Sequence, residues 1–292
     1  CVVAAIGTSM ANYLAYAGTL EPGDDVLIEH PAYGPMVEAA QLLGAKVRRL
    51  HRRFETGFMV EPEEIKRAIT PKTRLIVLTN MHNPSGALIS TDTLRAIGKI
   101  AEQNGARVLV DEVYLKMFFD NSVPSAFRLG ETFVITTSLT KVYGLSGLRC
   151  GWILAAPELA RRIWRINDLF GNIPSHTAEL LSVVALDHLP EIAQRSRALL
   201  ARNRPLLDNF LDSRGDIDFV RPPAGTVVFP KLAHGNTEQF IKLLREKYET
   251  AVVPGRFFEM PEHFRLGIGG DTELLRAGLE RISDALDEFA KK

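Results

Sequence analysis

Alternation between apolar, strand-like runs and helical segments is the feature that most limits what this chain can fold into. Runs rich in Val, Ile and Leu occur at residues 75–78, 108–110 and 132–137, and helical patterns separate such runs up to about Ala156. Strands that alternate with helices form a mostly parallel sheet, because each crossover helix packs on a face of that sheet. The sequence therefore predicts an α/β fold.

The pattern changes in the last third of the chain, where a long helix is expected at residues 191–211 and only short strands follow. A chain of 292 residues, 46% of them hydrophobic, is long enough for a full α/β core and a smaller domain. We predict a large domain at residues 1–189, and a linking helix with a small C-terminal α+β domain at residues 190–292. The other expected elements are helices at 91–104, 157–170, 177–187 and 238–247, strands at 217–220, 225–229, 251–253 and 264–268, and a terminal helix capped by Asp271.

Polar residues follow the three apolar runs at the same kind of position. Asn83 comes shortly after the first run, Asp111 directly after the second and Ser138 directly after the third. The carboxyl ends of parallel strands meet at one edge of an open sheet, where ligands bind. We therefore expect these residues at one ligand site.

Lys141 lies on a Gly-punctuated loop after the third run. A protonated lysine is a poor nucleophile, so chemistry at Lys141 requires partial desolvation or a nearby cation. Arg149 supplies a cation, and the apolar run supplies a dry wall. Taken by itself, Lys141 fits a solvated lysine at a strand end better than a nucleophile.

Two features near the start of the chain suggest further contacts for a ligand. Thr8 and Ser9 follow Gly7 and precede a helical pattern at residues 10–17, and a hydroxyl there caps the helix at an anion-binding N-terminus. An ordinary helix cap explains the same residues. Tyr33 lies in a turn framed by prolines, where its ring either stacks on a ligand or fills a corner of the core.

Several motifs taken together closely resemble those of the class I/II aminotransferases, which are pyridoxal-phosphate enzymes of fold type I. The resemblance extends over almost the whole chain, and its specificity lies in the order and separation of the motifs. The motifs are Asn83-Pro84-x-Gly86, Asp111-x-x-Tyr114, Ser138-x-x-Lys141 and Gly147-x-Arg149-x-Gly151.

The resemblance implies a role for each residue of the cofactor site. Lys141 forms the Schiff base with pyridoxal 5′-phosphate, Asp111 pairs with its pyridine nitrogen, and Asn83 and Tyr114 bond the ring oxygen. Lys141, Asp111 and Tyr114 are then the catalytic residues. The remaining cofactor contacts that it implies are Ser138 and Arg149 at the phosphate, Thr8 and Ser9 in the phosphate loop, and Tyr33 stacked on the ring.

The resemblance also implies that Arg265, helped by Asn83, grips the substrate α-carboxylate. Two of these roles also follow from chemistry. A carboxylate such as Asp111 favours a protonated pyridine nitrogen, and the planar guanidinium of an arginine can donate two parallel hydrogen bonds to a carboxylate. Arg265 lies in a short apolar strand, where burial without a partner is costly. An ion pair with a protein carboxylate is the alternative for Arg265.

The predicted reaction is reversible transfer of an amino group between an amino acid and a 2-oxo acid. The same residues serve carbon–sulfur β-lyases and decarboxylases, because a carbanion is common to all three reactions. Aminotransferase-like domains also occur as effector-binding modules of transcription regulators. Against the family, the chain is expected to lack a substantial N-terminal segment, since it begins at Cys1 near the phosphate loop.

Composition limits the kinds of molecule that the protein is expected to bind. Lys and Arg total 35 and Asp and Glu total 35, so no basic field suggests nucleic acid and no polybasic run suggests a membrane surface. Two cysteines cannot form a disulfide framework, which favours a reducing, cytoplasmic location. We expect a homodimer and no metal site, with His30 and His82 acting as packing or hydrogen-bonded residues.

Overall fold

A seven-stranded sheet forms the larger part of the protein, which we describe from a computed structural model of residues 1–119, 122–170 and 174–291. The strand order is β1-β7-β6-β5-β4-β2-β3. Only β7 runs against the others, pairing antiparallel with β1 and β6, so the predicted mostly parallel sheet is confirmed. The strands are β1 (Val2–Ile6), β2 (Asp25–His30), β3 (Lys46–His51), β4 (Thr73–Thr79), β5 (Arg107–Asp111), β6 (Phe133–Ser138) and β7 (Cys150–Leu154).

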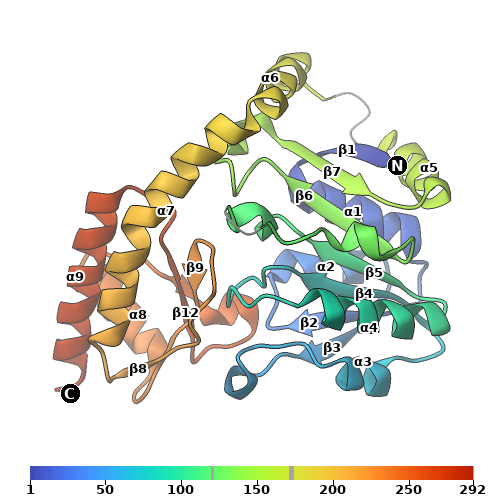
Figure 1. Cartoon of the computed structure of the whole chain (residues 1–292). Helices are drawn as coiled ribbons and strands as arrows, with labels where there is room; N and C mark the ends of the chain where they lie inside the picture. Colours follow the sequence, from blue (N-terminus) through green and yellow to red (C-terminus); the bar gives the residue numbers. More distant parts are fainter. Residues whose placement is uncertain (120–121, 171–173, 292) are drawn as a thin grey trace.

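Helices cover both faces of this sheet (Figure 1). Alternate side chains of one strand enter different cores: Leu75 and Val77 pack with the helices of one face, and Ile76 and Leu78 with those of the other. A parallel sheet needs this double cover because its strands are apolar on both sides. The first face carries α1 (Gly7–Thr19), α2 (Gly34–Leu42) and α5 (Pro157–Asn167), and the second carries α3 (Pro62–Ala68) and α4 (Thr91–Gln103).

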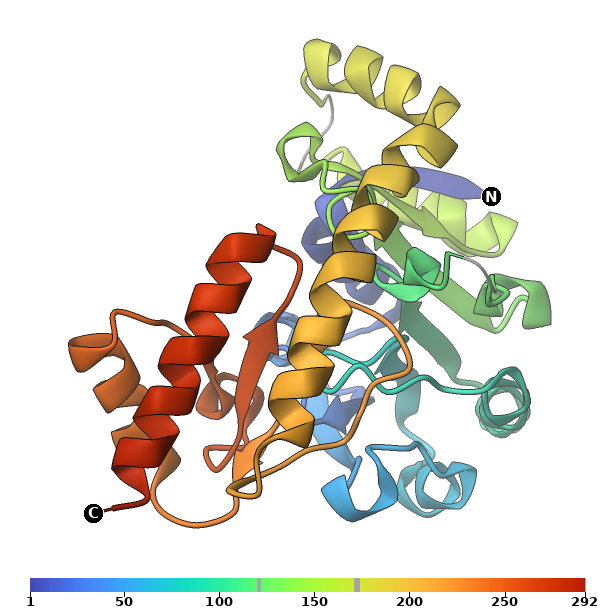
Figure 2. The ribbon, with the colours of Figure 1, turned by 60° about the vertical axis from the view of Figure 1, so that its left-hand side comes forward.

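The C-terminal part is built around a long helix and two small sheets, one of two strands and one of three (Figures 1 and 2). All of the helices predicted here are present, whereas the strands are shorter than predicted because each pairs over two to four residues. The helices are α6 (His176–Asp187), α7 (Leu189–Asp212), α8 (Thr237–Lys247) and α9 (Thr272–Phe289). The strands are β8 (Ile217–Asp218), β9 (Val227–Val228), β10 (Lys231–Leu232), β11 (Val253–Pro254) and β12 (Phe264–Gly267).

A separate apolar core holds this part together. Leu207, Phe210 and Leu211 from the second half of α7 pack there with side chains of α8, α9 and β12. Asp271 caps α9 as predicted, accepting from the backbone N–H groups of Glu273 and Leu274. The division between residues 189 and 190 stays a prediction, and the start of α7 at Leu189 is compatible with it.

Short 3-10 helices complete the fold at η1 (Phe54–Thr56), η2 (Leu115–Met117), η3 (Ala126–Leu129), η4 (Ser146–Leu148) and η5 (Gly255–Phe258). Within the residues described above, no helix is both long enough and apolar enough to cross a membrane.

Candidate active site

The carboxyl ends of three neighbouring strands carry the predicted site residues. Asp111 ends β5 and Ser138 ends β6, while Asn83 lies in the loop after β4. These strands are adjacent and parallel, with Asp111 opposite Thr79 of β4 and Thr136 of β6. The expectation that their polar ends share one edge of the sheet is confirmed.

Lys141 lines a cavity of about 590 Å³ together with Tyr114 and Arg265. Burial lowers the pKa of the Lys141 amine, and Arg265 and Arg149 lower it further while Asp111 opposes them. Arg265 has a larger effect than Arg149, so the predicted cationic neighbour is in fact a pair of arginines. A lowered pKa keeps more of the amine in its nucleophilic form.

Asp111 is buried and accepts two hydrogen bonds. The Asn12 side-chain amide donates to Oδ2 at 3.0 Å and the Val113 backbone N–H donates to Oδ1 at 3.0 Å. Burial raises the pKa of Asp111 from 3.8 to about 6, although the Asn12 and Val113 hydrogen bonds and Lys141 act against the rise. Lys141 acts on this carboxylate through its charge, whereas the two contacts within hydrogen-bond distance come from uncharged donors.

The sequence did not predict that Asn12 belongs to the site. Asn12 accepts a hydrogen bond from the Thr136 hydroxyl at 2.5 Å, which orients its amide toward the carboxylate. Asn12 lies on a helical face beside the buried residues Ala11 and Leu14. A polar side chain on an apolar face was the available signal, since a buried amide requires partners.

Arg265 on β12 reaches the site from the C-terminal part of the chain. Its Nη1 donates to Asn83 Oδ1 at 2.6 Å, and its guanidinium carbon lies 5.0 Å from the centre of the Phe258 ring. Within the described part of the chain it pairs with no carboxylate, so the alternative of an internal ion pair is wrong. Tyr114 is buried nearby, and burial raises the pKa of its hydroxyl.

The opposite end of the site joins the start of α1 to the end of β6. The Thr8 hydroxyl donates to Ser138 Oγ at 2.7 Å, and Arg149 Nη2 donates to the Ile6 carbonyl at 3.2 Å. Gly7 is favoured here because its φ is +78°, and a Cβ would in addition displace Arg149 Nη2, which would lie 2.3 Å away. A Cβ at Gly151 would likewise lie 2.7 Å from the Gly7 carbonyl carbon.

The prediction that Thr8 or Ser9 caps α1 is wrong. Strand β1 runs straight into the helix through Gly7, so that Ile6 is the N-cap and both hydroxyl residues lie inside the first turn. Ser9 is exposed. Because no side chain caps this N-terminus, its backbone N–H groups are left to bind an anion.

Tyr33 and His82 lie around the site, whereas the His30 ring packs against His51 and lies 3.6 Å from Glu259. Tyr33 precedes α2, is 43% exposed, and lies within electrostatic reach of Tyr114 and Arg265. Its ring stacking stays a prediction. His82 is buried and bonds the Ser85 hydroxyl at 2.6 Å and the Pro31 carbonyl at 2.9 Å, so its predicted role as a hydrogen-bonded histidine is confirmed.

The site fits a flat, phosphorylated aldehyde. An uncapped helix N-terminus and an arginine packed on glycine form a cradle for a phosphate, and a buried carboxylate whose hydrogen-bond donors are uncharged suits a protonated ring nitrogen. Lys141 supplies the amine that captures an aldehyde. Fold and site together define the class of enzymes that hold pyridoxal phosphate on a doubly covered, mostly parallel sheet.

Comparisons with known proteins identify the family. The model of the family "Aminotransferase class I and II" matches residues 2–282. Capreomycidine synthase from Streptomyces vinaceus is 30% identical over 290 residues, which are 98% of this chain and 74% of that protein. Aspartate aminotransferase from Bacillus subtilis is 25% identical, with 99% of this chain and 77% of the relative covered.

Solved structures agree with the sequence comparisons. A pyridoxal-phosphate-dependent aminotransferase from Streptococcus suis superposes with a TM-score of 0.94 at 30% identity, covering 99% of this chain and 77% of that chain. A tetra mutant of aspartate aminotransferase from Thermus thermophilus gives a TM-score of 0.91 at 26% identity, covering 97% of this chain and 79% of that chain. This chain belongs to the class I and II aminotransferases, so its fold, its pyridoxal-phosphate dependence and its amino-transfer chemistry are those of that family.

Proposed function

We propose that this protein exchanges an amino group between an amino acid and a 2-oxo acid, with Lys141 holding pyridoxal phosphate as a Schiff base. The observation that carries the proposal is that Lys141, Tyr114 and Arg265 line one cavity. When bound, the cofactor supplies an electron sink that stabilises negative charge on the substrate Cα. The residues around it bind, orient and move protons.

Asp111 keeps the cofactor ring nitrogen protonated. Its buried carboxylate accepts from Asn12 and Val113, and Lys141 is the cation whose charge favours its ionised form. A carboxylate in this state gains most from a positive partner, because burial makes an uncompensated charge costly. Asp111 therefore favours the protonated ring, on which the electron sink depends.

Lys141 moves the proton. With the cofactor bound and its amine free, Lys141 would take the proton from the substrate Cα and would return it at the cofactor C4′ carbon. The lowered pKa brings this amine closer to the working pH, which is the condition for efficient general base and acid catalysis. Release of the 2-oxo acid completes the half-reaction, and a second oxo acid reverses it.

Asn83 and Arg265 orient the substrate and the cofactor ring. Because Asn83 Oδ1 accepts from Arg265, the Nδ2 group of Asn83 is left to donate to the ring oxygen, alongside the Tyr114 hydroxyl. The rest of the Arg265 fork binds the substrate α-carboxylate through paired hydrogen bonds. These contacts would orient the Cα–H bond for removal of its proton, which favours amino transfer over decarboxylation.

The remaining predicted contacts hold the cofactor in place. Ser138, Thr8 and Arg149 surround the start of α1 and bind the phosphate with its free N–H groups, and Ser9 adds a hydroxyl at the same turn. Tyr33 stacks on the pyridine face and limits its tilt.

Two measurements on the protein loaded with pyridoxal phosphate test the proposal. Borohydride reduction followed by peptide mapping should label Lys141, and a label on another lysine would overturn the assignment. Half-reactions with a panel of amino acids should consume the cofactor absorbance and release the matching 2-oxo acid. Release of carbon dioxide, or of ammonia with a cleaved side chain, would identify the decarboxylase or β-lyase alternatives instead. Cofactor binding without turnover would favour an effector-binding module.

A homodimer formed through α6 is part of the proposal. This helix carries a row of apolar side chains, each between 43% and 57% exposed: Leu180, Leu181, Val183, Val184 and Leu186. Exposed apolar patches of this kind mark interaction surfaces. Figures 1 and 2 show α6 projecting from the sheet-bearing part. A cytoplasmic location is proposed with it, on the basis of two unpaired cysteines.

Sedimentation velocity tests the dimer. The double substitution Leu180→Glu and Val184→Glu should shift the protein toward the monomer. Leu274→Glu provides the matched control, because Leu274 is a more exposed apolar residue on α9 and lies outside the proposed face. Equal dimer dissociation in both variants, or a monomeric starting protein, would refute the proposed interface.

A further inference from the structure

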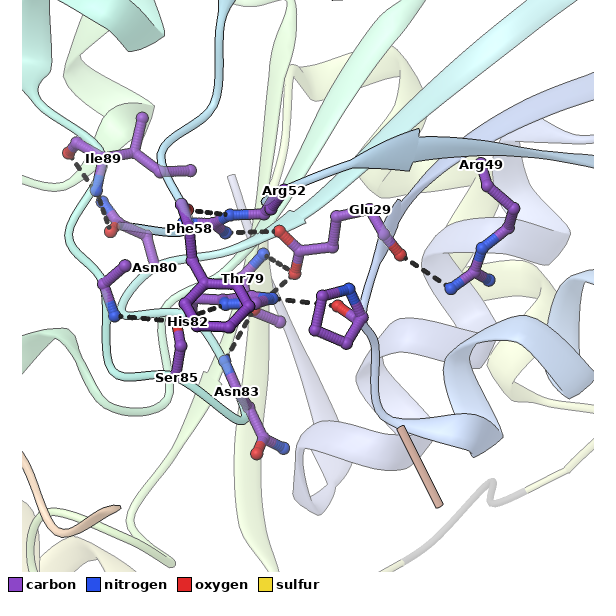
Figure 3. A network of polar contacts seen from close by, with 12 residues as sticks. Glu29, Arg49, Arg52, Phe58, Thr79, Asn80, His82, Asn83, Ser85 and Ile89 are labelled. Carbon is purple, nitrogen blue, oxygen red and sulfur yellow. Dashed lines mark hydrogen bonds and ion pairs between the residues drawn. The ribbon is translucent and has the colours of Figure 1, made fainter. Parts of the chain in front are cut away.

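A fully buried ion pair lies behind Asn83, outside the ligand cavity (Figure 3). Glu29 near the end of β2 and Arg52 just after β3 are 1% and 2% exposed, and Glu29 Oε2 lies 2.6 Å from Arg52 Nη1. Arg52 Nε also donates to the Phe58 carbonyl at 2.6 Å. The pair is therefore tied to the backbone on the arginine side.

The other oxygen of Glu29 leads toward the active site. Glu29 Oε1 accepts from the Thr79 backbone N–H at 2.7 Å and from the Thr79 hydroxyl at 2.5 Å. The same hydroxyl accepts from the Asn83 backbone N–H at 3.1 Å, and Asn83 in turn accepts from Arg265. A continuous chain of hydrogen bonds thus runs from Arg52 to Arg265 (Figure 3 shows it as far as Asn83).

The charge of Glu29 sets the direction of this chain. A carboxylate paired with Arg52 can only accept, so the Thr79 hydroxyl must donate to it and turns a lone pair toward the Asn83 N–H. Without the negative charge of Glu29, the Thr79 hydroxyl is free to rotate, and the Asn83 backbone N–H loses its fixed acceptor. The geometry of Asn83 therefore depends on a group that contacts neither cofactor nor substrate.

Stability alone does not explain such a pair. Desolvation of two charges is costly, and packed apolar residues often replace a buried ion pair without loss of stability. The neighbouring bonds of the same loop are also specific: Asn80 exchanges hydrogen bonds with the Ile89 backbone, and His82 is held between Ser85 and Pro31. These contacts order the loop around Asn83 from several sides.

We propose that Glu29, Arg52 and Thr79 are positioning residues, which hold the Asn83 amide at the distance and angle that the cofactor ring and the substrate require. The inference rests on the proposed function, because it takes Asn83 to donate to the cofactor ring oxygen. Displacement of Asn83 weakens that hydrogen bond, which raises the pH at which the bound cofactor changes its absorbance. It also loosens Arg265 and with it the grip on the substrate.

Thr79 offers a matched pair of variants for the test. Thr79→Val keeps the shape and removes the hydroxyl, whereas Thr79→Ser keeps the hydroxyl and removes a methyl group. In the protein loaded with pyridoxal phosphate, Thr79→Val should raise the midpoint of the spectral pH titration by about half a unit or more. It should also weaken binding of the amino acid that reacts fastest in the panel by about threefold to tenfold, while Thr79→Ser stays close to the wild type.

A second variant tests the charged pair itself. Glu29→Leu combined with Arg52→Met removes both charges and retains apolar packing, but it leaves the Thr79 N–H and the Phe58 carbonyl without their partners, so urea unfolding should show a lower midpoint than that of the wild type. Under conditions in which both proteins are folded, the spectral midpoint should shift as it does in Thr79→Val. A wild-type midpoint in either variant, or the same shift in Thr79→Ser, would overturn the inference. Failure of the proposed function has a different signature, namely absence of the borohydride label on Lys141 of the wild type.

Discussion

Asp111→Asn should change how the stability of the cofactor-free protein depends on pH. Burial raises the pKa of Asp111 from 3.8 to about 6 in the folded protein. The unfolded chain therefore loses this proton at a lower pH than the folded chain does. As the pH rises from about 4 to about 6, the folded state progressively loses stability on account of this residue.

The size of the effect follows from the pKa difference. A change from 3.8 to about 6 corresponds to about 3 kcal/mol of unfolding free energy, at 1.36 kcal/mol per pH unit. The contribution is favourable below pH 4 and absent above pH 7. Asparagine does not titrate, so the variant lacks this part of the pH dependence. Any hydrogen bonds altered at Asn12 or Val113 shift its stability at every pH equally and cancel from the slope.

Urea unfolding of cofactor-free protein between pH 4.5 and pH 8, for example at about five pH values, measures the difference. The wild type should lose about 2 kcal/mol relative to Asp111→Asn across this range, because about a third of the full change lies below pH 4.5. Glu112, whose pKa burial raises to about 7, titrates in both proteins, but the Asp111 charge adds to that rise, so the difference between the two curves includes a smaller contribution from Glu112 between pH 6 and pH 8. Parallel curves for the two proteins would refute the argument. Pyridoxal phosphate should then stabilise the wild type more than the variant, because only the carboxylate pairs with its ring nitrogen.

Three further predictions concern neighbouring parts of the site. Arg265→Lys keeps the charge but loses the planar guanidinium, so titrations with an amino acid should show a loss of about 2–5 kcal/mol in binding free energy. Arg149→Lys should instead weaken the binding of pyridoxal phosphate. If Arg265→Lys weakens cofactor binding and Arg149→Lys weakens amino-acid binding, the two proposed roles are wrong. Gly7→Ala should lower cofactor affinity at least about tenfold, since its Cβ would lie 2.3 Å from a guanidinium nitrogen, and Gly147→Ala, whose Cβ would meet nothing within 4 Å, should bind normally in the same fluorescence titration. Asn12→Leu removes a hydrogen bond to the Asp111 carboxylate and should therefore raise the pKa of Asp111. In spectrophotometric titrations, the pH below which the protein loses affinity for the cofactor should rise by about one unit. An unchanged pH dependence would exclude Asn12 from the site.

Local patterns were sufficient for much of the architecture. The strands that end at Asp111 and Ser138, and the helices along the C-terminal part, were predicted because apolar periodicity and turn residues act over a few neighbouring positions. The residues of the site were named from motifs, each of which lies within one short segment. The sequence by itself therefore determined the fold class and the chemical groups of the site.

Tertiary structure decided which of these groups meet. Arg265 bonds Asn83 across 182 residues, and Asn12 bonds Asp111 across 99. These contacts depend on a strand order that places β1 beside β7 and β4 between β2 and β5, and no local pattern encodes that order. The N-cap of α1 is Ile6 rather than Thr8 or Ser9, because β1 pairs with β7 and continues directly into the helix.

The buried pair of Glu29 and Arg52 is the strongest case. From the sequence alone, Glu29 and Arg52 would each be predicted to lie at the surface, because isolated charges are rarely buried. Only the fold brings β2, β3 and β4 together so that one carboxylate serves both Arg52 and Thr79. Partners that are distant in sequence offset the desolvation of these two charges, so the sequence alone could not predict that the pair is buried.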